Sequence, residues 1–312
     1  MFKINVLKWS ILVSGLGVML LGCSKDENYN EGFRFTEVID RNIEHVHGLG
    51  YTVEKDEIFV ATHSGLLKYS NWRWYETTAN KHDYMGFQAT DDGFYSSGHP
   101  YTDSDFKDPF GLIKSKDNGE TLEKLAFYGE SDFHHLAVGY YSHAIYAINE
   151  VPNSKLFTGI FFSENNGETW KTSKLNGLTS KSISKIATHP KEAALVGIST
   201  EEGLFYSTDF GDNFQKISKT DMITSLYFEE EALLFSSIAD GDARLYELDL
   251  STRLQKKIRL PEINSNDVII EITSNPLNRN EIVLISQKND IFLTKDRGYK
   301  WKQVVSNGKV GL

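Results

Sequence analysis

The segment Ser163-Glu164-Asn165-Asn166-Gly167-Glu168-Thr169-Trp170 decides how this chain of 312 residues folds. It reads as a tight turn that ends in an aromatic residue. The glycine admits a backbone with positive φ, and the side chains of Ser163 and Asn165 can bond to the amides of the turn. Similar segments occur three more times, at Ser115 to Leu122, Ser207 to Phe214 and Thr294 to Trp301. We interpret all four as structural turns, and we do not assign a hydrolytic role to their aspartates.

The spacing of these segments indicates a repeated architecture. Their starts lie 48, 44 and 87 residues apart (163 − 115, 207 − 163 and 294 − 207), and 87 is close to two periods. A fixed period of this length marks repeated structural units. We expect a diverged copy near Ser251, and one period before Ser115 leads to Leu67, so the chain has six units.

Each unit contains four runs of β-type residues, and four antiparallel strands per repeat of this length are typical of a propeller blade. We therefore predict an all-β fold, a six-bladed β-propeller. The alternative is a seventh blade, if Phe35 to Ile39 adds a strand that closes the ring.

The repeated segments resemble Asp-boxes, also called BNR-like repeats. The chain after residue 32 is similar, over nearly its whole length, to bacterial Asp-box propeller lipoproteins of the glycosyl hydrolase-like and sortilin-like kind. This resemblance implies a propeller with each box between the third and fourth strands of a blade. It implies little about activity, because one scaffold hosts many functions.

The first residues read as an export signal. Lys3 and Lys8 precede an apolar run from Ile11 to Leu21 that is short for a membrane span. The sequence Leu20-Leu21-Gly22-Cys23 resembles the lipobox of bacterial lipoproteins, and Cys23 is the only cysteine in the chain. We predict a lipoprotein signal peptide at residues 1–22, a lipid-anchored tether at 23–32 and the propeller domain at 33–312.

This interpretation places the protein outside the cytoplasm, held to the cell membrane by an acyl chain such as palmitate on Cys23. An uncleaved signal anchor is the alternative. The formal net charge is −10, and it becomes −12 when Lys3 and Lys8 are removed with the signal. Such a charge disfavours nucleic acid and anionic lipid as partners, so we predict no nucleic-acid binding.

Histidines gather in the first half of the chain, with eight of the nine between His45 and His143. In a propeller blade, the loop entering the first strand and the loop after the second strand lie on the same face. That placement predicts a ligand-binding cluster on one face, made of His45, His47, His63, His99 and His134. Four of these, His47, His63, His99 and His134, suit a divalent metal such as zinc or copper. The alternative is that they only hydrogen-bond neighbouring blades.

Three functions remain open. The first is the binding of a ligand, metal ion or partner protein at this histidine-rich mouth. The second is a glycoside hydrolase-like enzyme acting on extracellular glycans, in which Asp83 and Asp132 would be the two catalytic carboxylates. A scaffold without a small-molecule site is a third reading.

Asp-box propellers also include sialidases, and resemblance to a sialidase would imply three arginines on the channel face. A true sialidase is not expected here, because only Arg34 and Arg41 are placed to reach that face. The loop from Pro100 to Pro109 carries Asp103, Asp105 and Asp108, and we interpret it as a solvated acidic loop rather than a calcium site.

Overall fold

The computed structural model describes residues 32–52, 57–180, 182–218 and 222–310. The predicted signal peptide, Cys23 and the tether up to residue 31 lie outside these residues. Every regular element in the described ranges is a β-strand, which confirms the all-β fold. Accordingly, the described part of the chain contains no helix long and apolar enough to cross a bilayer.

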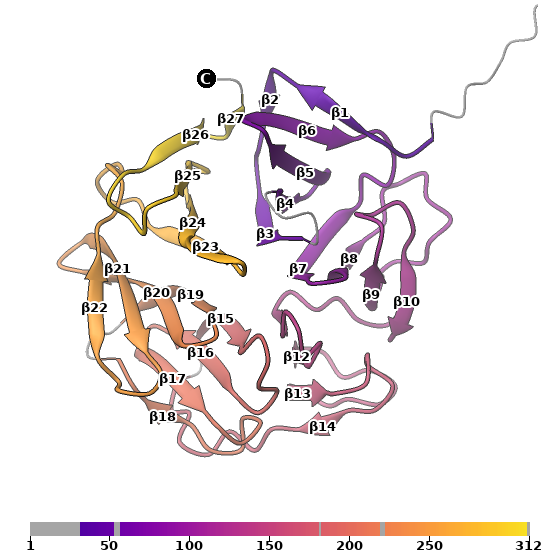
Figure 1. Cartoon of the computed structure of the whole chain (residues 1–312). Helices are drawn as coiled ribbons and strands as arrows, with labels where there is room; N and C mark the ends of the chain where they lie inside the picture. Colours follow the sequence, from indigo (N-terminus) through magenta and orange to yellow (C-terminus); the bar gives the residue numbers. More distant parts are fainter. Residues whose placement is uncertain (1–31, 53–56, 181, 219–221, 311–312) are drawn as a thin grey trace, which may run out of the picture. The chain divides into compact units, whose positions relative to one another are not determined.

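The strands form six antiparallel sheets (Figure 1). The first sheet has the order β1 (Phe35–Val38), β6 (Arg73–Thr77), β5 (Gly65–Ser70), β4 (Ile58–Thr62) and β3 (Val46–Tyr51). The second contains β7 (Asp83–Thr90), β8 (Gly93–His99), β9 (Leu112–Ser115) and β10 (Glu123–Ala126). The third contains β11 (Leu136–Val138), β12 (Ile145–Asn149), β13 (Gly159–Ser163) and β14 (Lys171–Thr172).

The other three sheets repeat this plan. The fourth contains β15 (Ile183–Thr188), β16 (Val196–Thr200), β17 (Gly203–Ser207) and β18 (Gln215–Lys216). The fifth contains β19 (Ile223–Phe228), β20 (Ala232–Ala239), β21 (Asp242–Asp249) and β22 (Gln255–Ile258). The sixth has the order β2 (Arg41–Asn42), β27 (Lys309–Val310), β26 (Lys302–Ser306), β25 (Ile291–Thr294), β24 (Asn278–Ser286) and β23 (Ile269–Asn275).

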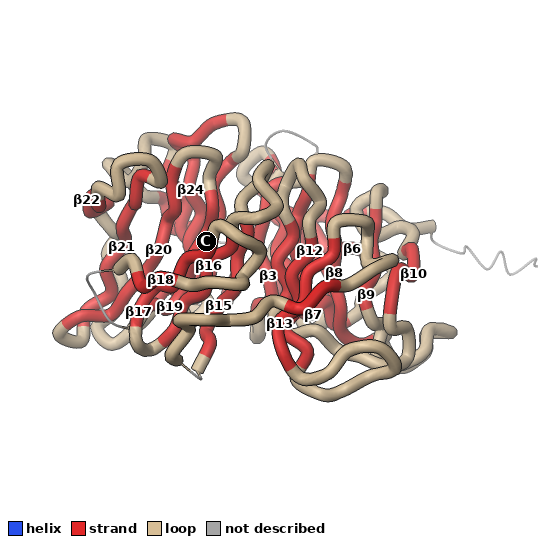
Figure 2. Tube along the Cα trace, turned by 90° about the horizontal axis from the view of Figure 1, so that it is seen from below, coloured by secondary structure: helices blue, strands red, loops and turns tan. Residues whose placement is uncertain are grey.

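The sheets are the six blades of a propeller, as predicted. The inner strands β3, β7, β11, β15, β19 and β23 follow one another around a central channel, and β23 contacts β3 (Figure 1). Strands run between two faces on which the loops gather (Figure 2). Because the blades share one strand order, all inner strands begin on one face. We call that end of the channel the entry mouth and the other end the exit mouth.

The ring is closed by the two ends of the described chain. Arg41 and Asn42 of β2 pair with Val310 and Lys309 of β27, so the sixth sheet contains residues from before the first blade. The segment Phe35–Val38 does form a strand, but it pairs with β6 on the outer edge of the first sheet. It therefore adds no seventh blade.

The core lies between neighbouring blades. One cluster joins Phe59 of β4 to Phe87 and Phe94 of the second blade, and all three side chains are almost fully buried. Burial of each such side chain stabilises the fold by about 1.5–3 kcal/mol. Next to the channel the blades approach so closely that a Cβ on Gly48 would lie 2.7 Å from the Cβ of Phe87. Glycine in β3 is therefore required by the packing of blade one against blade two.

The four repeated segments form one kind of turn between the third and fourth strands of their blades. In the first, the amide of Gly119 donates to Ser115 Oγ at 2.8 Å, and the amide of Thr121 donates to Asp117 Oδ1 at 2.8 Å. Equivalent bonds occur in the other three segments. Burial raises the pKa of Asp117, but the hydrogen bonds that Thr121 and Ser115 donate to its carboxylate outweigh this effect and hold the pKa below its usual value. Its carboxylate is thus occupied within the turn.

Candidate functional site

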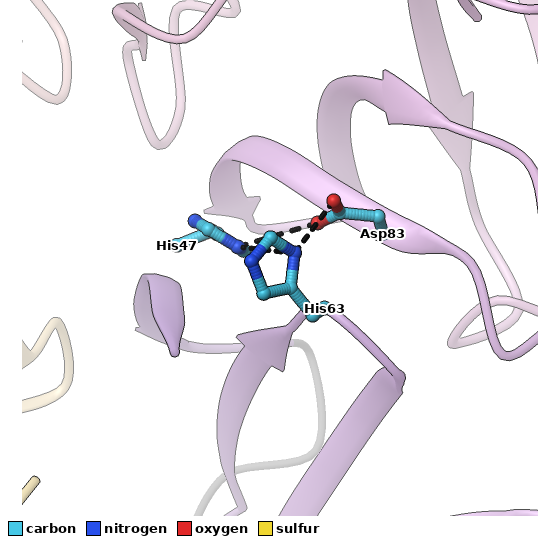
Figure 3. A group of neighbouring side chains, drawn as sticks. All are labelled: His47, His63 and Asp83. Carbon is cyan, nitrogen blue, oxygen red and sulfur yellow. Dashed lines mark hydrogen bonds and ion pairs between the residues drawn. The ribbon is translucent and has the colours of Figure 1, made fainter. Parts of the chain in front are cut away.

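The entry mouth carries the predicted histidines in two groups. The first, which we call the His47 group, consists of His47, His63 and Asp83 (Figure 3). His47 lies at a register shift in β3, His63 follows β4 directly, and Asp83 is the first residue of β7. The three side chains therefore come from three strand ends of two adjacent blades.

Their ligand atoms converge. His63 Nδ1 lies 2.7 Å from Asp83 Oδ2, and His47 Nε2 lies 3.2 Å from His63 Nδ1 and 3.3 Å from Asp83 Oδ1. His47 and Asp83 are largely buried, with 14% and 19% of their side chains exposed, whereas half of the His63 side chain is exposed. The group is thus fixed on its inner side and open to solvent through His63.

The electrostatics keep His47 neutral. Burial lowers its pKa to about 4, which outweighs the opposing effect of Asp83, and the neighbouring histidines lower it further. The lone pair of a neutral imidazole is available as a ligand. On Asp83, the Oδ1 oxygen is buried and makes no hydrogen bond among the described residues, although His47 Nε2 lies 3.3 Å from it. The group therefore presents unused acceptor capacity.

A pocket of about 230 Å³ adjoins the His47 group and is lined by Arg41, His45 and His63 among others. The ring of His45 lies edge-on to that of His63, with 4.8 Å between centroids. Arg41 is held in the pocket wall by hydrogen bonding to Ser64 at 2.6 Å and by an ion pair with Glu76 at 3.2 Å. Small polar molecules can reach His63 from this side.

The second set, the His99 group, consists of His99, Asp108, Asp132 and His134. His99 Nδ1 lies 2.5 Å from Asp108 Oδ1, and His99 Nε2 lies 3.1 Å from Asp132 Oδ2. His134 Nδ1 lies 3.3 Å from the same Asp132 oxygen. Burial lowers the pKa of His99, but the hydrogen bond that His99 donates to Asp108 and the charge of Asp132 outweigh it, so its pKa is raised.

The two groups repeat one arrangement. In each, a histidine at the end of the second strand of one blade, or directly after it, contacts the aspartate at the start of the next blade, as His99 contacts Asp132 and His63 contacts Asp83. The groups adjoin, since Asp83 and His99 are partners in the β7–β8 register. The four histidines expected in one metal site are thus divided between two groups, and both predicted carboxylates are engaged with histidines.

Asp108 was not predicted as a partner of His99. The loop that carries it is anchored by aromatic residues, since the buried ring of His82 packs against Phe106 and Phe110 and its Nδ1 accepts a hydrogen bond from the Tyr101 amide at 3.2 Å. The aromatic residues of this otherwise acidic segment could have indicated, from the sequence, that the loop packs against the protein.

A further group of Asp91, Asp92 and His143 lies on the exit face, with ligand atoms within 4.8 Å of one another. Lys114 Nζ is 2.7 Å from Asp92 Oδ2 and already neutralises part of the negative charge of this group.

The arginines are placed as follows. Arg279 and Arg297, which the sequence did not place on the channel face, bind Glu229. Arg41 is the arginine that lines the pocket beside the His47 group.

Comparison with known proteins supports a propeller family. The sequence profile described as Sortilin, neurotensin receptor 3 (Sortilin-Vps10) matches residues 111–260, slightly less than half of the chain. No curated protein matches it.

Solved structures show the same fold at low identity. A GH74 enzyme from Niastella koreensis is 18% identical over 86% of this chain and 47% of its own, with a TM-score of 0.53. The GH74 xyloglucanase from Xanthomonas campestris is 14% identical over 88% of this chain and 47% of its own, also with a TM-score of 0.53. The chain thus spans about half the length of these enzymes. An oligogalacturonate lyase in complex with manganese is 10% identical over 88% of this chain and 84% of its own, with a TM-score of 0.55.

Proposed function

We propose that this propeller binds a divalent metal ion, zinc or copper, through His47, His63 and Asp83 at its entry mouth, and uses the bound ion to hold a further ligand. The observation that carries the proposal is the convergence of two imidazole nitrogens and a carboxylate from two blades. Among the described residues, two groups of three histidines or carboxylates have ligand atoms that all lie within 4.8 Å of one another: this group and the group around His143.

The spacing of the ligand atoms around His47 is close to that around a tetrahedral ion. Metal–ligand distances of about 2.0–2.1 Å place tetrahedral ligands about 3.3 Å apart. His47 Nε2 lies 3.2 Å from His63 Nδ1 and 3.3 Å from Asp83 Oδ1, whereas the 2.7 Å contact of His63 Nδ1 is with the other carboxylate oxygen, Oδ2. A cation bound by Oδ1 would also satisfy that oxygen, which is buried and makes no hydrogen bond among the described residues.

Three protein ligands leave one tetrahedral position free, which is typical of catalytic and ligand-binding zinc sites rather than structural ones. The adjacent pocket of about 230 Å³ provides access to that position, and its walls include Arg41 and His45. A ligand that binds the metal from the pocket would lie beside Arg41, whose guanidinium is held by Glu76 and Ser64.

The fold is compatible with this role at the level of architecture. The manganese-bound oligogalacturonate lyase has the same fold over most of both chains. The proposal itself rests on the side chains of this protein, because so low an identity carries only the fold.

Metal content tests the proposal. The protein from Ser24 onward, purified without a histidine tag and incubated with zinc or copper before desalting, is expected to retain about one ion per chain by mass spectrometry of the metal. The His47→Ala and His63→Ala variants should lose it. The His143→Ala variant is the matched control, because it removes a histidine from the other candidate group and should retain the ion. Failure of the protein to retain either metal would refute the proposal.

We further propose that the protein works outside the cytoplasm, anchored to the membrane through a lipid on Cys23. The lipobox-like sequence that ends at Cys23 supports this location.

A further inference from the structure

A second pocket lies at the exit mouth, on the face opposite the His47 group. Its volume is about 280 Å³, and its walls come from segments that end or follow four inner strands, with Tyr140, Tyr141, Pro190, Tyr227, Phe228 and Leu277 prominent among them. It is therefore formed jointly by blades three to six. Nothing in the metal proposal uses it.

Aromatic rings form much of this exit pocket. The rings of Tyr140 and Tyr141 stand nearly perpendicular, with 4.8 Å between centroids and 83° between planes. Tyr227 is fixed by a hydrogen bond from its hydroxyl to the backbone oxygen of Ser274 at 3.2 Å. Two perpendicular rings form a corner in the pocket wall, and Lys191 Nζ lies over the ring of Tyr141, 5.3 Å from its centroid. Pockets lined largely by aromatic side chains are typical of ligand sites.

The charged residues of the pocket are paired with one another. Glu230 lies 2.7 Å from Lys191, and Arg279 lies 3.0 Å from both Glu229 and Glu231. The charges around the pocket are thus satisfied internally. A charged ligand would have to displace an existing partner, so the pocket favours a neutral one.

Two hydroxyl groups of the pocket, by contrast, can bond a ligand. The hydroxyls of Tyr140 and Tyr141 make no hydrogen bond to another residue in the described ranges. The Ser274 Oγ also has no partner there, but it is fully buried and out of reach of a ligand in the pocket. A ligand that carries hydroxyl groups would satisfy the two tyrosine hydroxyls.

We propose that the exit pocket binds a neutral sugar unit, with the apolar face of its ring against the tyrosines and its hydroxyls bonded to those of Tyr140 and Tyr141. The volume suits a single ring, since it is at the lower end of ligand pockets. The sugar stays at the mouth. Behind it the channel narrows to a cavity of about 50 Å³, which is room for a few waters, and Lys185 pairs with Glu271 across it.

The test is binding of the purified, untagged protein to an array of neutral, acidic and basic oligosaccharides, followed by calorimetry with the neutral hits and their free monosaccharides. Comparison of the last two tells whether the site takes a free sugar or the end of a glycan. Tyr141→Ala is expected to weaken binding about tenfold, because it removes one wall of the aromatic corner. The Tyr140→Phe/Tyr141→Phe double variant keeps both rings and should weaken binding about threefold to tenfold through the lost hydroxyls.

Tyr299→Ala is the matched control, because this tyrosine is 77% exposed in a turn outside the pocket, and its loss should leave binding unchanged. Metal retention should be the same in all these variants, which separates this proposal from the entry-mouth site. Binding of charged glycans alone, absence of neutral-glycan binding, or neutral binding that survives Tyr141→Ala in a folded variant would each overturn it.

Discussion

Protonation of His82 should destabilise the loop that carries Asp108. His82 is fully buried among Tyr84, Tyr101, Phe106 and Phe110, and burial lowers its pKa from 6.5 to about 4. Because its pKa in the folded protein lies below its unfolded value, the unfolded chain binds the proton more tightly. Stability is therefore retained above about pH 6.5 and is lost as the pH falls toward 4.

The size of the effect follows from these two pKa values. At pH 7.5 the difference between folded and unfolded protonation contributes almost nothing. At pH 4.5 protonation of His82 favours the unfolded chain over the folded protein by about 2.5 kcal/mol. This follows from the two pKa values, since each pKa unit corresponds to about 1.36 kcal/mol. The His82→Phe substitution keeps an aromatic ring and removes the titrating nitrogens, although it leaves the Tyr101 amide without its acceptor.

The assay is equilibrium unfolding by urea, followed by tryptophan fluorescence, of both proteins at pH 7.5 and pH 4.5. The wild type should lose about 2.5 kcal/mol more than His82→Phe between the two pH values. Other groups such as His47 are present in both proteins and cancel in this double difference. A double difference below about 0.5 kcal/mol would show that His82 is not held neutral by burial, and the reasoning would be wrong.

Three further predictions concern the turns, the charge network and the anchor. Gly298→Ala should reduce the free energy of unfolding by about 2–4 kcal/mol, since its φ is +91° and the new Cβ would lie 2.6 Å from a side-chain carbon of the neighbouring blade. Gly241→Ala, with φ of +83° in open space, should cost only about 1 kcal/mol in the same urea titration. Arg297→Met should cost about 3 kcal/mol, because Glu229 is 4% exposed and loses its closest cation, and adding Glu229→Gln should recover part of that loss. Cys23→Ser should abolish labelling by a palmitate analogue and move the protein from the membrane to the soluble fraction, and an unchanged distribution would contradict the proposed anchor.

The blades could be predicted from sequence because their signals are local. A hydroxyl residue, an aspartate or asparagine, and a glycine at fixed spacing define each turn without reference to the rest of the chain. Even the diverged turn at Ser251 lies between β21 and β22, where Asp249 Oδ1 accepts hydrogen bonds from the amides of Ser251 and Thr252. The local sequence could not show where the strand Phe35–Val38 pairs. Its partner depends on which sheet has a free outer strand, and that strand is β6 of the first blade.

The candidate sites depended on relations between blades, which no local pattern contains. Strand starts indicated that His47, His63 and Asp83 share a mouth. The division into two groups follows from the β7–β8 register, which sets Asp83 opposite His99 and leaves Asp132 to bind His99. The exit pocket could not be predicted from the sequence, because its walls come from four different blades.

Because β2 pairs with β27, the ring can close only after the last strand of the domain has been synthesised. Arg41 is among the first residues of the domain to be made, and its partner Val310 is among the last. All six blades have four strands from a continuous stretch of chain, whereas the outer β2–β27 pairing of the sixth blade requires the two ends to meet across the whole domain. Loop closure over that length makes this contact a late event in folding. A ribosome that stops, or a protease that cuts, a few residues short of Val310 would therefore leave the four strands β23 to β26 of the sixth blade but remove the β2–β27 pairing that closes the ring.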